Sequence, residues 1–128
     1  MGTGTNIGRV RGLGSAKSGT HHWWLQRLTA GGNILLLLWF VFSILKLPAL
    51  DHRNVVEWMA SPLVAVPLLL LVVNTFWHFR LGLQVVIEDY QHEYSRVLAI
   101  VLLNFYTVGA AALAIFAILR IAFAGAVA

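Results

Sequence analysis

The sequence predicts an all-α integral membrane protein with three transmembrane helices. Of its 128 residues, 59% are hydrophobic and only 11% are charged, whereas soluble domains carry about 45–50% apolar and about 25% charged residues. Three apolar segments are each close to the roughly 20 residues that a helix needs to cross the hydrocarbon core. Because lipid offers backbone groups no water to bond, these segments must be helices.

The three spans are predicted at residues 24–47, 62–87 and 97–121. The first is centred on the run ILLLLWFVF, and the third is rich in alanine. Pro62 suits the first turn of the second span, since the missing N–H of proline costs nothing there.

The segments outside the spans predict the orientation. Residues 1–23 and the loop at 88–96 share one side, and the loop at 48–61, with Trp58 as an expected interfacial anchor, faces water on the other. Lys and Arg are more frequent on the first side, so the positive-inside rule places it in the cytoplasm, or in the mitochondrial matrix, and the 48–61 loop in the periplasm. A short tail, residues 122–128, follows the third span.

Composition also excludes several classes of function. The chain has no cysteine, which rules out disulfides and thiolate metal sites. The net charge of +4 comes from basic residues near the membrane ends, where they set orientation, so we expect lipid and not nucleic acid as the partner. Residues 1–22 are polar and glycine-rich, and no signal peptide is expected.

A polar stripe on the second span is the strongest candidate for function, because ionisable groups inside a membrane are costly. At about 100° per residue, a narrow stripe holds Asn74, His78, Val85 and Asp89, with Gly82 beside it. His78 is predicted near the middle of the bilayer. Asp89 follows about 16 Å further along the helix axis, at the membrane edge.

Three roles are open for His78. It could hydrogen-bond a neighbouring helix, relay protons, or ligate haem iron, a common role of histidine. A relay needs further ionisable groups at the same depth, and helix geometry alone ranks packing first and haem second. If the haem has two histidine ligands, the second must come from another chain, because the remaining histidines lie near membrane edges or in loops: His21, His22, His52 and His92.

Polar residues at the membrane edge allow two interpretations each. Tyr90 and Asp89 could bind a quinone head group, whose reduction needs hydrogen bonds and protons, but tyrosine is also common at membrane interfaces without further function. Arg27 could snorkel to lipid phosphates or pair with a buried anion such as a haem propionate. Gly31 and Gly32 predict close packing between helices.

Two motifs stand out in the chain: HFRLGLQVVIEDY fits the pattern H-x3-G-x6-D-Y, and GTHHWWLQRLTA fits G-x-H-x5-R-x-T-A at the start of the first helix. Both resemble the smaller hydrophobic membrane-anchor subunit of succinate dehydrogenase (Complex II, succinate:quinone oxidoreductase). Three spans and the chain length agree as well. The resemblance implies that the three helices form half of a haem-binding anchor bundle, completed by the larger anchor subunit of the complex.

The resemblance also implies roles for five residues. His78 would be an axial ligand of the haem b iron, with the other ligand from the larger anchor subunit. Tyr90 would hydrogen-bond ubiquinone, and Asp89 would support that site. Arg27 and His21 would lie near the haem propionates and the quinone pocket.

The resemblance further implies a subunit that is not catalytic alone. The flavoprotein and iron–sulfur subunits would oxidise succinate, and the anchor would link this step of the tricarboxylic acid cycle to the respiratory chain. We expect the bacterial inner membrane in preference to the mitochondrial one. A quinol:fumarate reductase anchor and a purely structural three-helix protein are the alternatives. His22 has no counterpart in the pattern, and Arg80, opposite the stripe, is expected to face a partner subunit or the haem edge.

Overall fold

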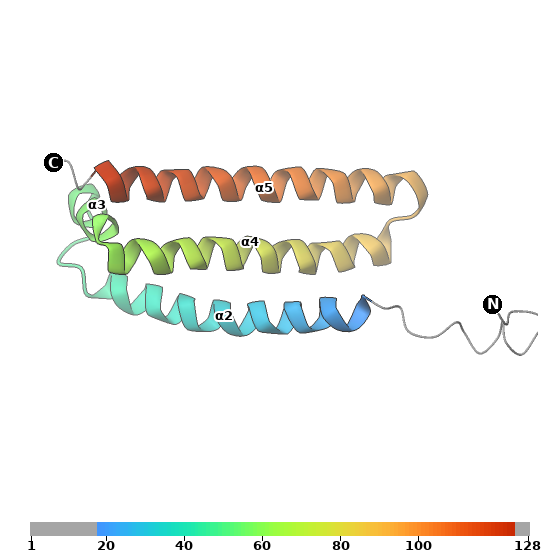
Figure 1. Cartoon of the computed structure of the whole chain (residues 1–128), viewed down its shortest axis with the longest axis horizontal. Coiled ribbons are helices and arrows are strands. Elements are labelled where there is room, and N and C mark those ends of the chain that lie inside the picture. The colour runs from blue at the N-terminus through green and yellow to red at the C-terminus, as the bar shows by residue number, and fades with distance from the viewer. Residues whose placement is uncertain (1–17, 125–128) are drawn as a thin grey trace, which may run out of the picture.

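The computed structural model of the chain describes residues 18–124, which form four helices joined by short links (Figure 1). The three long ones are α2 (Gly19–Leu45), α4 (Pro62–Tyr90) and α5 (Glu93–Ala124), and each is long and apolar enough to cross a membrane. The predicted fold class is therefore confirmed. Most of the predicted N-terminal segment and the end of the tail lie outside the described residues.

The long helices extend beyond the predicted spans. α2 begins at Gly19 instead of residue 24, and α4 continues through Tyr90, so the loop predicted at 88–96 shrinks to the two residues between α4 and α5. The last turns of α4 are polar, and Gln84 Nε2 donates to Glu88 Oε1 at 2.8 Å, a helical i,i+4 pair. Hydropathy reports where a helix leaves lipid and not where it ends, which explains the difference.

The segment predicted as a loop at 48–61 contains a further helix, α3 (His52–Ala60). Asp51 caps it, because its side chain accepts a hydrogen bond from the Asn54 N–H at 2.9 Å. Trp58, the expected interfacial anchor, turns toward the bundle: its Nε1 donates to Ser43 Oγ at 2.9 Å, and its ring stacks on Trp39 with centroids 6.3 Å apart. This stretch is polar only on one face, which is why it folds back onto the long helices.

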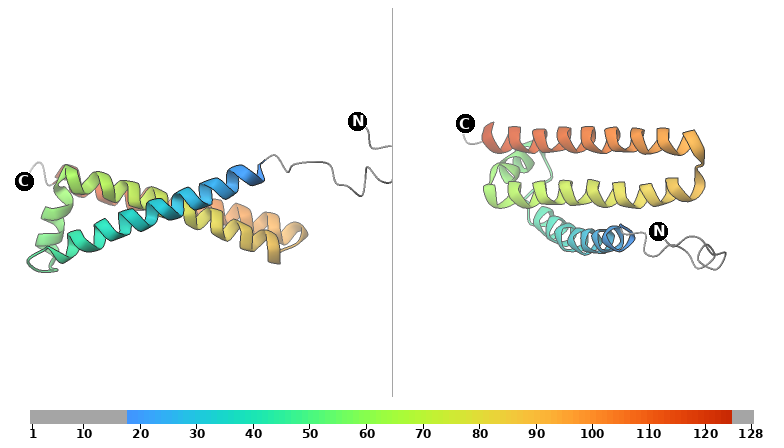
Figure 2. Two further views of the ribbon diagram at one scale, coloured as in Figure 1. Left: turned by 90° about the horizontal axis from the view of Figure 1, so that it is seen from below. Right: turned by 45° about the vertical axis from the view of Figure 1, so that its right-hand side comes forward.

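The central helix of the bundle is α4, which packs between α2 and α5 (Figure 1). α4 and α5 run side by side along their whole length, whereas α2 crosses α4 obliquely, as Figure 2 shows. α3 closes the gap between the helices at one end, beside a small core of Ala65, Leu68 and Ile118. At the other end, α2 and α4 diverge (Figure 2), and two residues of the predicted stripe, His78 and Val85, line a pocket between them.

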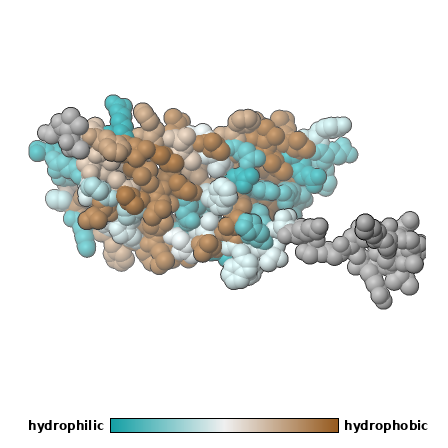
Figure 3. Space-filling view, in the orientation of Figure 1, coloured by the Kyte–Doolittle hydropathy of each residue, from teal (hydrophilic) through white to brown (hydrophobic). Residues whose placement is uncertain are grey.

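Apolar side chains cover the middle of the molecule, and hydrophilic ones gather mainly toward its ends (Figure 3). Large exposed side chains occur on all three long helices, among them Leu35, Leu63 and Phe105. Few of the described side chains are buried within the chain. The long helices must therefore cover their apolar surface with lipid or with other chains.

The close approach of α2 and α4 depends on one of the two adjacent glycines. A Cβ added at Gly32 would lie 3.0 Å from Asn74 Nδ2, whereas nothing lies within 4 Å of a Cβ added at Gly31. The predicted packing role is thus confirmed for Gly32, and the contacts of the described chain give no such role to Gly31.

This difference predicts unequal effects of two neighbouring substitutions. Gly32→Ala should destabilise the helix pair by about 1–3 kcal/mol, the usual cost of overpacking, because the added methyl displaces the Asn74 amide. Gly31→Ala is the matched control and should be neutral or slightly stabilising, since alanine favours helix. Unfolding of the full chain in detergent, followed by circular dichroism, measures both. Equal effects of the two variants would contradict the assignment.

Candidate functional site

His78 lies where α4 faces α2, and its ring already has one partner. His78 Nδ1 is 3.0 Å from Thr29 Oγ1. Thr29 is only 7% exposed and is the one buried residue of α2. His78 therefore hydrogen-bonds a neighbouring helix through Nδ1, which is the first of the three roles considered for it. This contact leaves Nε2 available for a ligand.

A polar cluster next to His78 holds the two helices together. Asn74 Nδ2 donates to the Thr29 carbonyl at 2.7 Å and to Asn33 Oδ1 at 2.9 Å. Thr75 Oγ1 donates to the same Asn33 oxygen at 3.1 Å. Thr29 and Asn33 were not among the residues predicted from the sequence, although both are polar and one helical turn apart in an apolar span, which is a usable signal.

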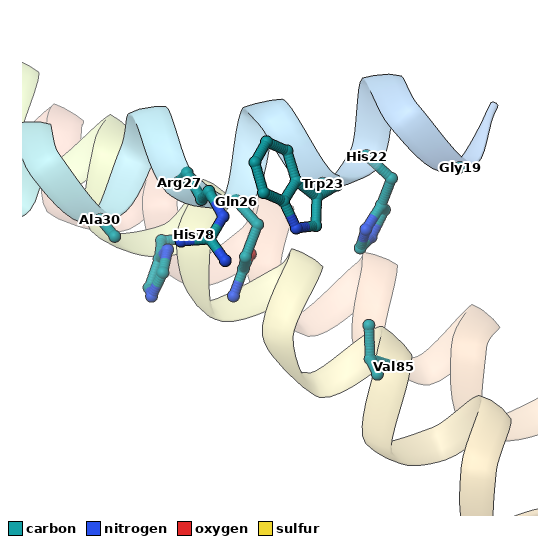
Figure 4. A pocket seen from close by; sticks show the side chains of 8 residues that line it. All are labelled: Gly19, His22, Trp23, Gln26, Arg27, Ala30, His78 and Val85. Carbon is teal, nitrogen blue, oxygen red and sulfur yellow. The ribbon is translucent and has the colours of Figure 1, made fainter.

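Beyond this cluster, the diverging helices flank an open pocket of about 510 Å³, here called the α2–α4 wedge (Figure 4). α2 contributes most of its lining, and α4 contributes two residues on the predicted stripe. The guanidinium carbon of Arg27 lies 4.2 Å from the centre of the Trp23 ring, a cation–π contact that holds a positive charge at the wedge. The lining residues are Gly19, His22, Trp23, Gln26, Arg27, Ala30, His78 and Val85.

One polar atom in the wedge is unsatisfied. Gln26 Oε1 is buried without a hydrogen-bond partner among the described residues, at a usual cost of about 1–3 kcal/mol. On the same side chain, Nε2 would lie 3.3 Å from a Cβ added at Gly82, so the absence of a side chain at Gly82 makes room for the amide.

The predicted site residues separate into two groups. His78 and Arg27 both line the wedge, and His22 lines it as well, whereas His21 is exposed and outside it. The doubled histidine could not be resolved from sequence, because adjacent residues point about 100° apart on a helix whose rotation was unknown.

Asp89 and Tyr90 form the second group, on the last turn of α4. Both are exposed, Tyr90 to 77%, and neither side chain has a hydrogen-bond partner within residues 18–124. Tyr90 is about 18 Å from His78 along the helix axis. Neither residue lines the wedge, so a site that includes them would need a surface outside residues 18–124.

Arg80 contacts α5 within the chain, an interaction that was not predicted beside the expected contact with a partner subunit or the haem edge. Its Nε donates to Asn104 Oδ1, and its guanidinium lies 5.6 Å from the centre of the Trp77 ring. Asn104 in turn donates to the Ile100 carbonyl at 2.9 Å. A charged side chain in an apolar span is stabilised by a polar partner inside the bundle. No pattern in the sequence related Arg80 to Asn104, because the two residues lie on different spans.

This pair predicts an interaction energy between α4 and α5. Asn104→Leu should destabilise the chain by about 1 kcal/mol more when Arg80 is present than in an Arg80→Leu background, in the range of interhelical hydrogen bonds in membranes. The four variants of this double-mutant cycle can be unfolded in detergent. Identical costs of Asn104→Leu in both backgrounds would show that the two side chains do not interact.

Comparison with known proteins identifies the family of the chain. A family model described as "Succinate dehydrogenase/Fumarate reductase transmembrane subunit" matches residues 1–111. The succinate dehydrogenase hydrophobic membrane anchor subunit of Rickettsia bellii is 36% identical over 86% of this chain and 91% of that protein. Its counterpart in Rickettsia conorii is 38% identical over 74% and 78%, and that of Paracoccus denitrificans is 27% identical over 87% and 86%.

No solved structure is significantly similar to the chain. The family match nevertheless includes both motifs, the wedge and the last turn of α4. The chain therefore belongs to the family of succinate dehydrogenase/fumarate reductase transmembrane subunits.

Proposed function

We propose that this chain anchors a succinate:quinone oxidoreductase in the membrane, supplies one axial ligand of haem b and contributes to the ubiquinone site. The observation that carries the proposal is His78 at the α2–α4 wedge, engaged through Nδ1 and accompanied by the cation of Arg27. Histidine with one nitrogen fixed and the other free is the usual arrangement of a haem-iron ligand.

The residues of the wedge fit a haem. His78 would hold the iron through Nε2, and Arg27 would pair with a propionate. When bound, haem supplies a one-electron carrier. The tasks of this chain are to orient the ring and to neutralise the carboxylates.

A second ligand from another chain remains part of the proposal. His22 lines the same wedge, but it lies at the opposite end from His78 in Figure 4. His22 lies seven positions before Thr29, the partner of His78. This spacing corresponds to about 10 Å along α2. These observations favour a histidine of the larger anchor subunit.

For ubiquinone, this chain would contribute the last turn of α4. The Tyr90 hydroxyl would donate to a quinone carbonyl, and the Asp89 carboxylate would hold a cationic group or a proton nearby. Their exposure supports a pocket whose remaining walls belong to other subunits. The N-terminus of α2 lies at the same end of the bundle (Figure 1), so the greater Lys and Arg content of that end supports a cytoplasmic quinone site.

Electron transfer from succinate would require partners. The chain has no cysteine for iron–sulfur ligation, so a flavoprotein and an iron–sulfur protein would oxidise succinate and carry electrons to the anchor. The names of the bacterial relatives favour succinate dehydrogenase over the fumarate reductase alternative.

Affinity purification of the tagged chain from its host membranes tests the proposal. We expect a flavoprotein, an iron–sulfur protein and a second hydrophobic subunit to copurify, together with succinate:quinone reductase activity. Recovery of the chain without a flavoprotein would instead support the purely structural alternative.

A further inference from the structure

We propose that Thr29 is a positioning residue for His78: it holds the imidazole in the Nδ1–H tautomer and so makes Nε2 the ligand atom. The inference deepens the proposed function and rests on it where haem is concerned. The hydrogen bond itself is a property of the folded chain and can be tested without haem.

The tautomer follows from the single proton of the Thr29 hydroxyl. Thr29 Oγ1 lies 2.7 Å from the Leu25 carbonyl and 3.0 Å from His78 Nδ1. The shorter distance is typical of O–H···O bonds and the longer one of N–H···O bonds. A helical threonine commonly donates to the carbonyl four residues earlier. The hydroxyl therefore accepts its second bond, and the proton of that bond resides on Nδ1.

The backbone of Thr29 is fixed by the same helix that carries His78. Asn74, one turn before His78 on α4, donates to the Thr29 carbonyl at 2.7 Å. Two residues of α4 thus hold Thr29. His78 contacts the Thr29 side chain, and Asn74 contacts the Thr29 main-chain carbonyl. Gly32 permits this approach, because a Cβ there would lie 3.0 Å from the Asn74 amide. The hydroxyl is consequently held still relative to the ring that it orients.

In a histidine that ligates a metal, the ring N–H that does not face the metal usually donates a hydrogen bond. The acceptor of that bond fixes the ring and raises the basicity of the ligating nitrogen. A more basic nitrogen donates more electron density, which favours ferric over ferrous iron. Removing the Thr29 hydroxyl should therefore shift the haem reduction potential upward. It should also weaken haem binding by about 10–100-fold, the usual effect of losing such a partner.

Three variants of the complete membrane complex separate this role from simple packing. Thr29→Val removes the hydroxyl with little change in shape, and Thr29→Ser retains it. Thr107→Val is the matched control, because Thr107 is also buried, at 5% exposure, and also donates to a carbonyl four residues earlier, at 2.7 Å, but on α5. Redox titration of the haem absorption is the readout.

We expect an upward potential shift in Thr29→Val, and wild-type potentials in Thr29→Ser and Thr107→Val. An unchanged potential in Thr29→Val with haem retained, or an equal shift in Thr107→Val, would overturn the role of Thr29 while leaving the proposed function intact. Absence of haem from the wild-type complex would overturn the proposed function instead.

Nitrogen-15 NMR of histidine-labelled full chain, with the His78 signals assigned through His78→Gln, gives a second test that needs no haem. The wild-type chain should show the Nδ1–H tautomer at His78, and Thr29→Val should lose it. An Nε2–H tautomer in the wild-type chain would overturn the inference, even if Thr29→Val failed to accumulate.

Discussion

Replacement of His78 by alanine is expected to remove the low-spin haem b absorption from the purified complex. The variant removes the imidazole that α4 contributes to the wedge. The polar groups next to it, which are a threonine, an asparagine and a glutamine, are poor iron ligands, and His22 lies about 10 Å further along α2. Loss should be nearly complete, because a low-spin haem needs both axial positions filled. Reduced-minus-oxidised difference spectra measure it.

The matched control is His52→Ala, at an exposed histidine of α3 at the other end of the bundle. It should leave the spectrum unchanged. An unaltered haem spectrum in the His78 variant would mean that the iron is held elsewhere and that His78 serves only to join α4 to α2.

Replacement of Tyr90 by phenylalanine should lower quinone reductase activity by about ten- to hundredfold. The lost hydrogen bond would be made to a quinone oxygen that gains negative charge on reduction, and hydrogen bonds to charged groups are worth roughly 1.5–3 kcal/mol. The ring is retained, so the change removes only the hydroxyl that would polarise the quinone carbonyl. Succinate oxidation with an artificial acceptor should be unaffected, because it bypasses the membrane site.

Tyr94→Phe is the control, since Tyr94 is 89% exposed at the start of α5, at the same end of the bundle as Tyr90. Its activities should match those of the wild type. If Tyr90→Phe also retains full quinone reductase activity, then Tyr90 is an interfacial anchor and the quinone binds to other subunits.

The sequence was sufficient to predict the three spans, because hydropathy reports directly on contact with lipid. It was also sufficient to place Asn74 and His78 on one face of α4, because that relation is local and set by the helical repeat. The ends of α4 and α5 and the existence of α3 were not predictable in this way. They depend on helix caps and on the packing of Trp58 against Trp39.

The partners across helices could not be predicted at all, because they depend on where two helices cross and how each is rotated. The Thr29–His78 and Arg80–Asn104 pairs both join residues that no local pattern relates. The same unknown rotation left His21 and His22 equivalent in the sequence, although only His22 lines the wedge. Conversely, Asp89 and Tyr90 were placed at the membrane-edge end of the second span, and the structure has both exposed on the last turn of α4.

The central claim is that the α2–α4 wedge is half of a haem site that another subunit completes. The most direct measurement is the haem b content per copy of this chain, determined for the purified complex and for the chain produced alone. We expect one low-spin haem per copy in the complex and none in the isolated chain. A complex that contains the flavoprotein and iron–sulfur subunits but no haem, or an isolated chain that binds low-spin haem by itself, would contradict the claim.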